Sequence, residues 1–162
     1  NQGWRQLAGQ GKFEAAARSI ENYLRDHPDL NPFQIGNLHF HAGQMRAFAR
    51  QYDLARNHFE SSLHERDETK APVKFDAYVR ATIAFLEEDS QALDECLEKI
   101  AAGEPIDGEI PNLKIVRALR KSIGQPYSEV YGPFAGMPLS GAGQAGVSKE
   151  EKGKRISFPT TG

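Results

Sequence analysis

Apolar residues of this chain recur with a helical spacing that repeats along the sequence. One stripe consists of Phe13, Ala16, Ile20, Tyr23 and Leu24. The same spacing returns at Tyr52, Ala55, Phe59, Ser62 and Leu63. Residues separated by three and four positions share one face of an α-helix, whereas a strand would alternate apolar and polar residues. The spacing therefore predicts helices and no sheet.

A second stripe repeats at an offset of 37 residues. Leu38, Ala42, Met45 and Ala49 map onto Phe75, Val79, Thr82 and Leu86. At the same offset, the stripe that begins at Tyr52 maps onto Asp89, Ala92, Cys96, Lys99 and Ile100, where three of the five positions stay apolar or small. Two apolar stripes that both repeat after 37 residues predict a repeated pair of helices, and such pairs stack on one another and share a core.

Proline and asparagine mark the expected ends of the helices. Pro28 is expected to close one helix, and Asn31 with Pro32 to open the next as N-cap and first helical residue. Pro72 is expected to open a later helix in the same way. Asn112 is expected to cap a last long helix that reaches Ile123. A short helix is expected from Pro126 through Tyr131.

The domain organisation follows from where this pattern stops. Residues 1–132 are predicted to form one helical-repeat domain, since 162 residues suffice for one core. Residues 133–162 are rich in Gly, Pro and Ser and are predicted to be an extended tail. Within it, Phe134, Met137 and Leu139 are apolar anchors expected to lie in a groove. Self-association through the tail is a further expectation.

Two segments carry a resemblance to a known family. "GKFEAAARSIENYLRDHP" and "RQYDLARNHFESSL" resemble the second helix of a tetratricopeptide repeat, and "HAGQMRAFARQYDLA" adds Gly43 at the small position of a first helix. The segments "LHFHAGQMRAFA" and "GQPYSEVYG" also look like bacterial repeat proteins of no assigned activity. The resemblance implies an all-α, right-handed α-α superhelix of about three helical hairpins, followed by a capping helix and the tail.

A repeat of this kind leaves one face lined by the first helices of the hairpins. The flank beside the buried stripe at Leu38 carries residues that resemble the ligand-facing positions of the family. Together with their counterparts 37 residues later, the expected peptide-binding residues are Asn37, His41, Gln44, Phe48, Lys74, Tyr78 and Phe85. They combine aromatic side chains with hydrogen-bonding groups, as a peptide groove requires.

Composition and charge exclude several classes of function. The net charge of −2 gives no reason to expect binding to nucleic acid. No stretch approaches the ~20 apolar residues needed to span a bilayer. A single cysteine, Cys96, excludes an internal disulfide and fits a cytoplasmic or a periplasmic protein. The expected partner is a protein or peptide, and no cofactor is expected.

An enzyme is the alternative. His39 and His41 lie ~200° apart around a helix, so they do not share a face and no metal site is expected there. A hydrolytic or metal-dependent site would instead have to pair His41 with His58. No nucleophile motif or glycine-rich phosphate loop accompanies them. The sequence therefore favours a non-enzymatic interaction module.

Overall fold

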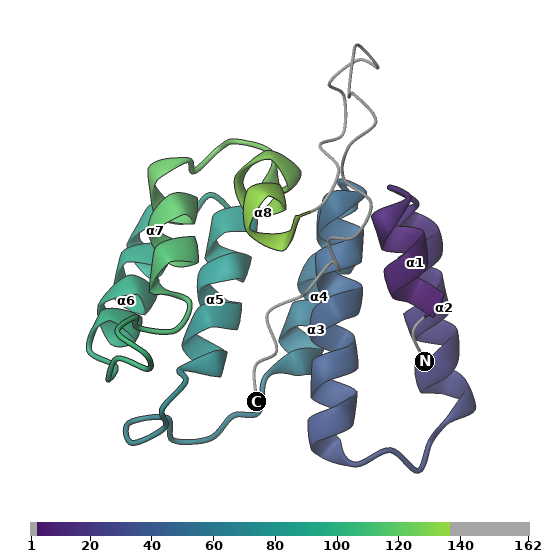
Figure 1. Cartoon of the computed structure of the whole chain (residues 1–162), viewed down its shortest axis with the longest axis horizontal. Coiled ribbons are helices and arrows are strands. Elements are labelled where there is room, and N and C mark those ends of the chain that lie inside the picture. The colour runs from purple at the N-terminus through teal and green to yellow at the C-terminus, as the bar shows by residue number, and fades with distance from the viewer. Residues whose placement is uncertain (1–2, 137–162) are drawn as a thin grey trace.

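The computed structural model describes residues 3–136, which form eight α-helices and no strand (Figure 1). Their bounds are α1 Gly3–Gly9, α2 Phe13–Asp26, α3 Pro32–Phe48, α4 Tyr52–Ser62, α5 Phe75–Leu86, α6 Ser90–Ala101, α7 Leu113–Lys121 and α8 Tyr127–Ala135. The prediction of an all-α chain is confirmed.

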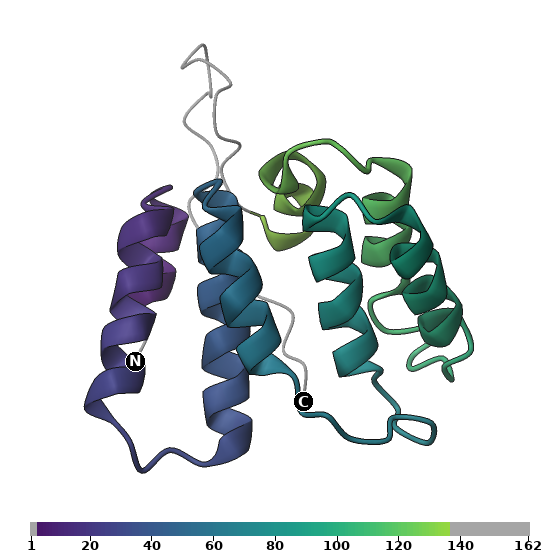
Figure 2. The same ribbon diagram turned by 180° about the vertical axis from the view of Figure 1, so that it is seen from behind.

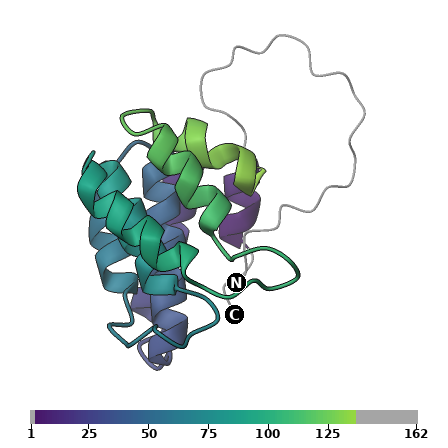
Figure 3. The ribbon, with the colours of Figure 1, turned by 90° about the vertical axis from the view of Figure 1, so that its left-hand side faces the viewer.

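Each helix from α1 to α8 packs against the next one along the chain. Helices α2, α4 and α6 lie together on one side, and α1, α3, α5 and α7 on the other (Figures 1 and 2). Helix α8 packs on α7 and α3, on the side away from α4 and α6 (Figure 3). The winding of these pairs into a right-handed, tetratricopeptide-like superhelix stays a prediction.

The start of α3 shows how the local sequence fixes a helix end. The Asn31 side chain accepts a hydrogen bond of 2.9 Å from the Gln34 amide, and the Gln34 side chain accepts one of 3.1 Å from the Asn31 amide. Pro32 occupies the first turn, where its missing amide hydrogen is not needed. The predicted start is confirmed, and α2 ends at Asp26, two residues before Pro28.

The start of α5 differs from the prediction at Pro72. This helix begins at Phe75, and the side chain of the N-cap residue Lys74 makes no capping bond. The Glu68 carboxylate accepts hydrogen bonds from the amides of Asp76 at 2.8 Å and Ala77 at 3.2 Å. An acidic side chain from the preceding loop therefore satisfies the first turn, and the helix does not need Pro72 as its first residue.

The last two helices also differ in detail from the prediction. Asn112 does occupy the N-cap position of α7, but with a φ of 65° and no side-chain capping bond. Helix α8 extends to Ala135, past the predicted start of the tail after Gly132. Phe134 thus lies on α8, where it is exposed. Met137 and Leu139 lie outside the described residues.

The repeated stripes supply much of the core. The paired positions Ala42 and Val79 are both fully buried. Leu38 is only half-buried, and the larger contribution at that end of α3 comes from Phe40. The Phe40 ring lies 5.4 Å from that of Phe75, between centroids, and so joins the second helix pair to the third. The sequence analysis had not identified Phe40.

None of the helices in residues 3–136 is long and apolar enough to cross a membrane.

Candidate functional site: the first-helix face beneath helix α8

Four of the seven predicted binding residues meet on one surface, which we call the first-helix face. Gln44 and Phe48 come from α3, and Tyr78 and Phe85 come from α5. Their exposed fractions are 0 % for Gln44, 2 % for Phe48, 1 % for Tyr78 and 3 % for Phe85. The four residues therefore do not line an open groove, because α8 covers them.

Helix α8 contributes two tyrosines to this surface. Tyr127 and Tyr131 are one helical turn apart, and their rings stack with centroids 5.1 Å apart and planes inclined by 11°. The Phe48 ring lies 5.4 Å from Tyr127 and 6.0 Å from Tyr131, edge to face in both cases. Phe85 lies 6.4 Å from Tyr127. The contact is thus an aromatic cluster shared by α3, α5 and α8.

Gln44 provides the polar anchor of the cluster. Its Nε2 donates a hydrogen bond of 2.8 Å to the Tyr131 hydroxyl. Its Oε1 lies 3.1 Å from His41 Nδ1, which therefore carries a proton and donates. The His41 ring lies 5.0 Å from the Trp4 ring of α1. A buried amide satisfied at both ends fixes the position of α8 more specifically than apolar packing alone.

Burial determines the charge state of the site. It lowers the pKa of His41 to about 4, helped by the nearby Arg5 and opposed by the hydrogen bond with Gln44. Burial, with neighbouring phenols, raises the pKa of Tyr78 and of Tyr127 well above 10.0. Around neutral pH the imidazole and the phenols are therefore all uncharged.

Two hydroxyl groups in the cluster lack a well-aligned hydrogen bond. The Tyr78 and Tyr127 hydroxyls are buried and make no hydrogen bond of normal geometry within residues 3–136, although Tyr131 lies near the first and Gln44 near the second. Leaving a polar group buried and unpaired costs about 1–3 kcal/mol. The contact between α8 and the first-helix face is therefore well packed but incompletely satisfied.

Asn37 and Lys74 do not join this cluster. Asn37 is half-buried on α3, one turn before His41. The Lys74 ammonium group donates to the backbone carbonyl oxygens of Glu68 and Thr69, at 2.5 Å and 2.8 Å. Lys74 thus holds the loop before α5 and does not contribute to the first-helix face. The repeat offset identified its backbone position but not the direction of its side chain.

The Lys74 side chain lines a pocket of about 590 Å³ between this loop, α5 and α6. Its acidic groups are already engaged. Asp76 accepts hydrogen bonds from the His64 and Glu65 amides, and Glu68 accepts two at the start of α5. Burial raises the pKa of the Cys96 thiol, which also lines the pocket, so Cys96 is not an activated nucleophile.

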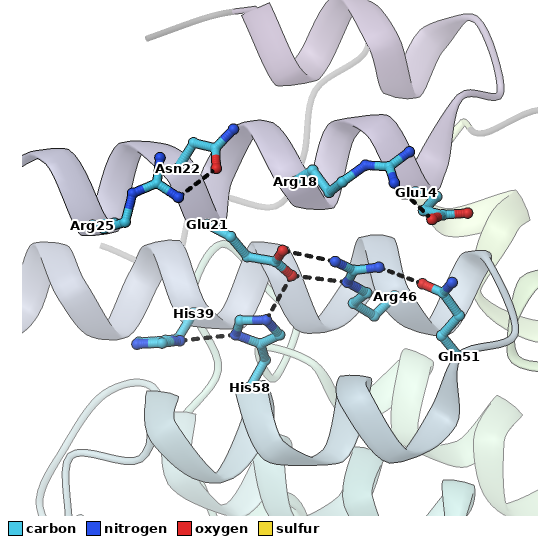
Figure 4. A network of polar contacts seen from close by, with 9 residues as sticks. All are labelled: Glu14, Arg18, Glu21, Asn22, Arg25, His39, Arg46, Gln51 and His58. Carbon is cyan, nitrogen blue, oxygen red and sulfur yellow. Dashed lines mark hydrogen bonds and ion pairs between the residues drawn. The ribbon is translucent and has the colours of Figure 1, made fainter.

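A polar network joins α2, α3 and α4 on another part of the molecule (Figure 4). Arg46 donates two hydrogen bonds to the Glu21 carboxylate, at 2.8 Å and 2.7 Å, and a third to Gln51. His58 Nε2 lies 2.9 Å from Glu21, and His58 Nδ1 lies 2.9 Å from His39 Nδ1. Burial alone would raise the pKa of Glu21, but the hydrogen bonds from Arg46 and His58 lower it below its usual value.

The enzyme alternative required His41 and His58 to act together. In the structure His41 faces Trp4 and Gln44, whereas His58 uses both ring nitrogens for Glu21 and His39. The histidine pair that forms is His39 with His58. No cluster of three or more His, Cys, Asp or Glu side chains suited to a metal ion occurs within residues 3–136. The geometry therefore gives no support to that alternative.

No protein-family model matches the chain, and neither a curated protein nor a solved structure does. The tetratricopeptide resemblance rests on the residues quoted for it.

Trp4, Tyr127 and Tyr131 were not among the predicted site residues. The signal for the last two was present, because tyrosines at i and i+4 after Pro126 place two aromatic rings on one face of a short helix. No comparable signal marked Trp4, whose packing on His41 depends on how α1 lies against α3.

Proposed function

We propose that this chain is a non-enzymatic interaction module whose first-helix face binds a short helical segment of a partner protein. In the free chain α8 occupies that face. The observation that carries the proposal is the contact itself, because the face already holds a nine-residue helix through two stacked tyrosines and one buried hydrogen bond.

The composition of the face supports this function. Aromatic side chains with a hydrogen-bonding group beside them are the usual anchors of protein interfaces. A helix laid in an apolar groove is a common mode of peptide recognition. In the proposed tetratricopeptide-like arrangement, the first helices also line the ligand-facing side.

Helix α8 has the properties of a replaceable occupant. A helix shorter than ~12 residues is barely stable alone, so α8 depends on the first-helix face for its helicity. Pro133 lies inside it, which removes one backbone hydrogen bond. A partner helix that offered the Tyr78 hydroxyl a well-aligned hydrogen bond would pair a buried group for which α8 supplies only the nearby Tyr131 hydroxyl.

The test uses the full chain with Tyr127→Ala and Tyr131→Ala, which leaves the face intact but removes both anchors of α8. A synthetic peptide of residues 126–136 with the native sequence is titrated against it by fluorescence polarisation. We expect saturable binding at one site. The unsubstituted chain should bind the peptide at least about 10-fold more weakly, because its own α8 competes at a high effective concentration.

The control is the same peptide with both tyrosines replaced by alanine. It should not bind, because the anchors are absent, and circular dichroism confirms that the double variant stays helical. Equal binding of the two peptides, or no binding of the native peptide to the helical variant, would contradict the proposed function.

A further inference from the structure

The connection that brings α8 back onto its own chain is one tight turn. Residues 122–126 link α7 to α8, and the Ser122 carbonyl accepts a hydrogen bond of 3.0 Å from the Gln125 amide. Gly124 is the third residue of this turn, with a φ of 85°. A turn with a positive φ at its third position requires glycine or asparagine there. The seating of α8 on its own chain therefore depends on the conformation of Gly124.

Within the connection, Ile123 packs partly buried against the core, whereas Gly124 and Gln125 are exposed. A cavity of about 220 Å³ lies beneath it, between Gly124, Pro126 and side chains that include Tyr52 and Phe85. The Tyr127 amide donates a hydrogen bond of 3.3 Å to the Tyr52 hydroxyl. A Cβ atom added at Gly124 would meet no atom within 4 Å. Gly124 itself is thus loosely packed at the surface of the turn.

Helix α8 packs on α7 and α3, and its two tyrosines reach aromatic side chains of α3 and α5. Gln44 and Phe48 on α3 and Phe85 on α5 contact its two tyrosines. Every copy of the chain carries both this surface and an α8 that fits it. An α8 from a second copy would reproduce each of these contacts, so only the turn and the cost of association distinguish the two arrangements.

We infer that the first-helix face accepts α8 from a second copy of this chain, so that two chains exchange α8 and form a symmetric dimer. The inference rests on the proposed function, since it names one partner for the same surface. The closed turn keeps α8 on its own chain in dilute solution. Opening the turn at high protein concentration gives the exchanged dimer.

The test is Gly124→Ala in the full chain. Alanine disfavours the left-handed conformation by about 1 kcal/mol. Only the closed turn has this conformation, so the equilibrium constant for opening one turn should rise roughly fivefold. Because a dimer contains two opened turns, the dimerisation constant should rise roughly 30-fold. Size-exclusion chromatography with light scattering, from dilute to concentrated protein, measures this constant.

Gly108→Ala is the matched control. Gly108 has a φ of 83°, close to the 85° of Gly124, and an added Cβ atom there would also meet nothing within 4 Å. It lies in the connection between α6 and α7, away from the α8 turn. Gly108→Ala should carry a similar backbone strain and leave the dimerisation constant unchanged. An equal rise for both variants, or none for Gly124→Ala, would overturn the inference.

Comparing Gly124→Ala with and without the two tyrosine substitutions distinguishes a dimer that exchanges α8 from a dimer that forms through another surface. Adding Tyr127→Ala and Tyr131→Ala to Gly124→Ala removes the anchors of α8, so an exchanged dimer should be lost. A dimer that persists would overturn the exchange.

If the native peptide binds the double tyrosine variant but Gly124→Ala stays monomeric, the proposed function stands and only the second copy is wrong as its partner. If the peptide does not bind, the proposed function fails first.

Discussion

At the scale of single residues, Gln44 shows how a polar side chain is retained in an aromatic core. Its amide nitrogen donates to Tyr131 and its amide oxygen accepts from His41. Buried amides are stable only when both ends are paired, because each unpaired end costs about 1–3 kcal/mol. Gln44 thereby links the α1 side of the molecule, through His41 and Trp4, to α8.

His41 makes the stability of the molecule depend on pH. Its pKa falls from 6.5 to about 4 on folding, so the unfolded chain binds more protons between these values. The stabilisation is complete above pH 6.5 and is lost as the pH falls toward 4. We expect the free energy of unfolding, measured in urea, to fall by about 1 to 2 kcal/mol from pH 7 to pH 5 through this residue.

His41→Gln is the variant that isolates this effect. Glutamine retains a donor for the Gln44 oxygen but does not titrate. In this variant, the decrease in the free energy of unfolding from pH 7 to pH 5 should be smaller by the roughly 1 to 2 kcal/mol assigned to His41. Part of the decrease should remain because of His39, whose pKa is lowered by burial and by His58. An unchanged pH dependence in this variant would mean that His41 is not buried as described.

At the scale of helices, the contact between α3 and α4 depends on a glycine beneath an aromatic ring. A Cβ atom on Gly43 would lie 2.8 Å from Phe59 Cδ1, which is too close for any other residue without a shift. Phe59 is fully buried and lies 5.7 Å from the Phe40 ring. The small residue at Gly43 thus allows the two helices to approach as closely as they do.

Phe59→Ala should lower the free energy of unfolding by about 3–5 kcal/mol, because it leaves a cavity between α3 and α4. His39→Ala on the same pair of helices is the comparison. His39 is half-buried and bonded to His58, so its loss should cost about 1 kcal/mol. Urea unfolding measures both. Equal costs for the two variants would show that the buried face of α4 has been assigned wrongly.

The helices that could be predicted were those whose ends are encoded locally. Asn31, Pro32 and Gln34 are adjacent in sequence and are sufficient to start α3. The start of α5 could not be read in this way, because Glu68 reaches it from seven residues before Phe75. A capping group supplied by a folded loop leaves no signature at the helix itself.

At the scale of the whole molecule, Gln44, Phe48, Tyr78 and Phe85, four of the residues selected by the repeat offset, are all buried. Their role in binding a peptide stays a prediction. The offset carried no information on what covers them, since α8 lies outside the repeated stripes. An extended tail was expected to be the nearest cover for such a surface, and in the structure helix α8 covers it.

The central feature of the molecule is the contact between helix α8 and the first-helix face, which we propose to be a binding surface. Nuclear Overhauser effects between aromatic rings in the intact chain test this most directly. We predict cross-peaks from the Phe48 ring to the rings of Tyr127 and Tyr131, whose centroids lie 5.4 Å and 6.0 Å away. Tyrosine rings of α8 with the chemical shifts of free peptide, and no cross-peak to Phe48, would contradict the account.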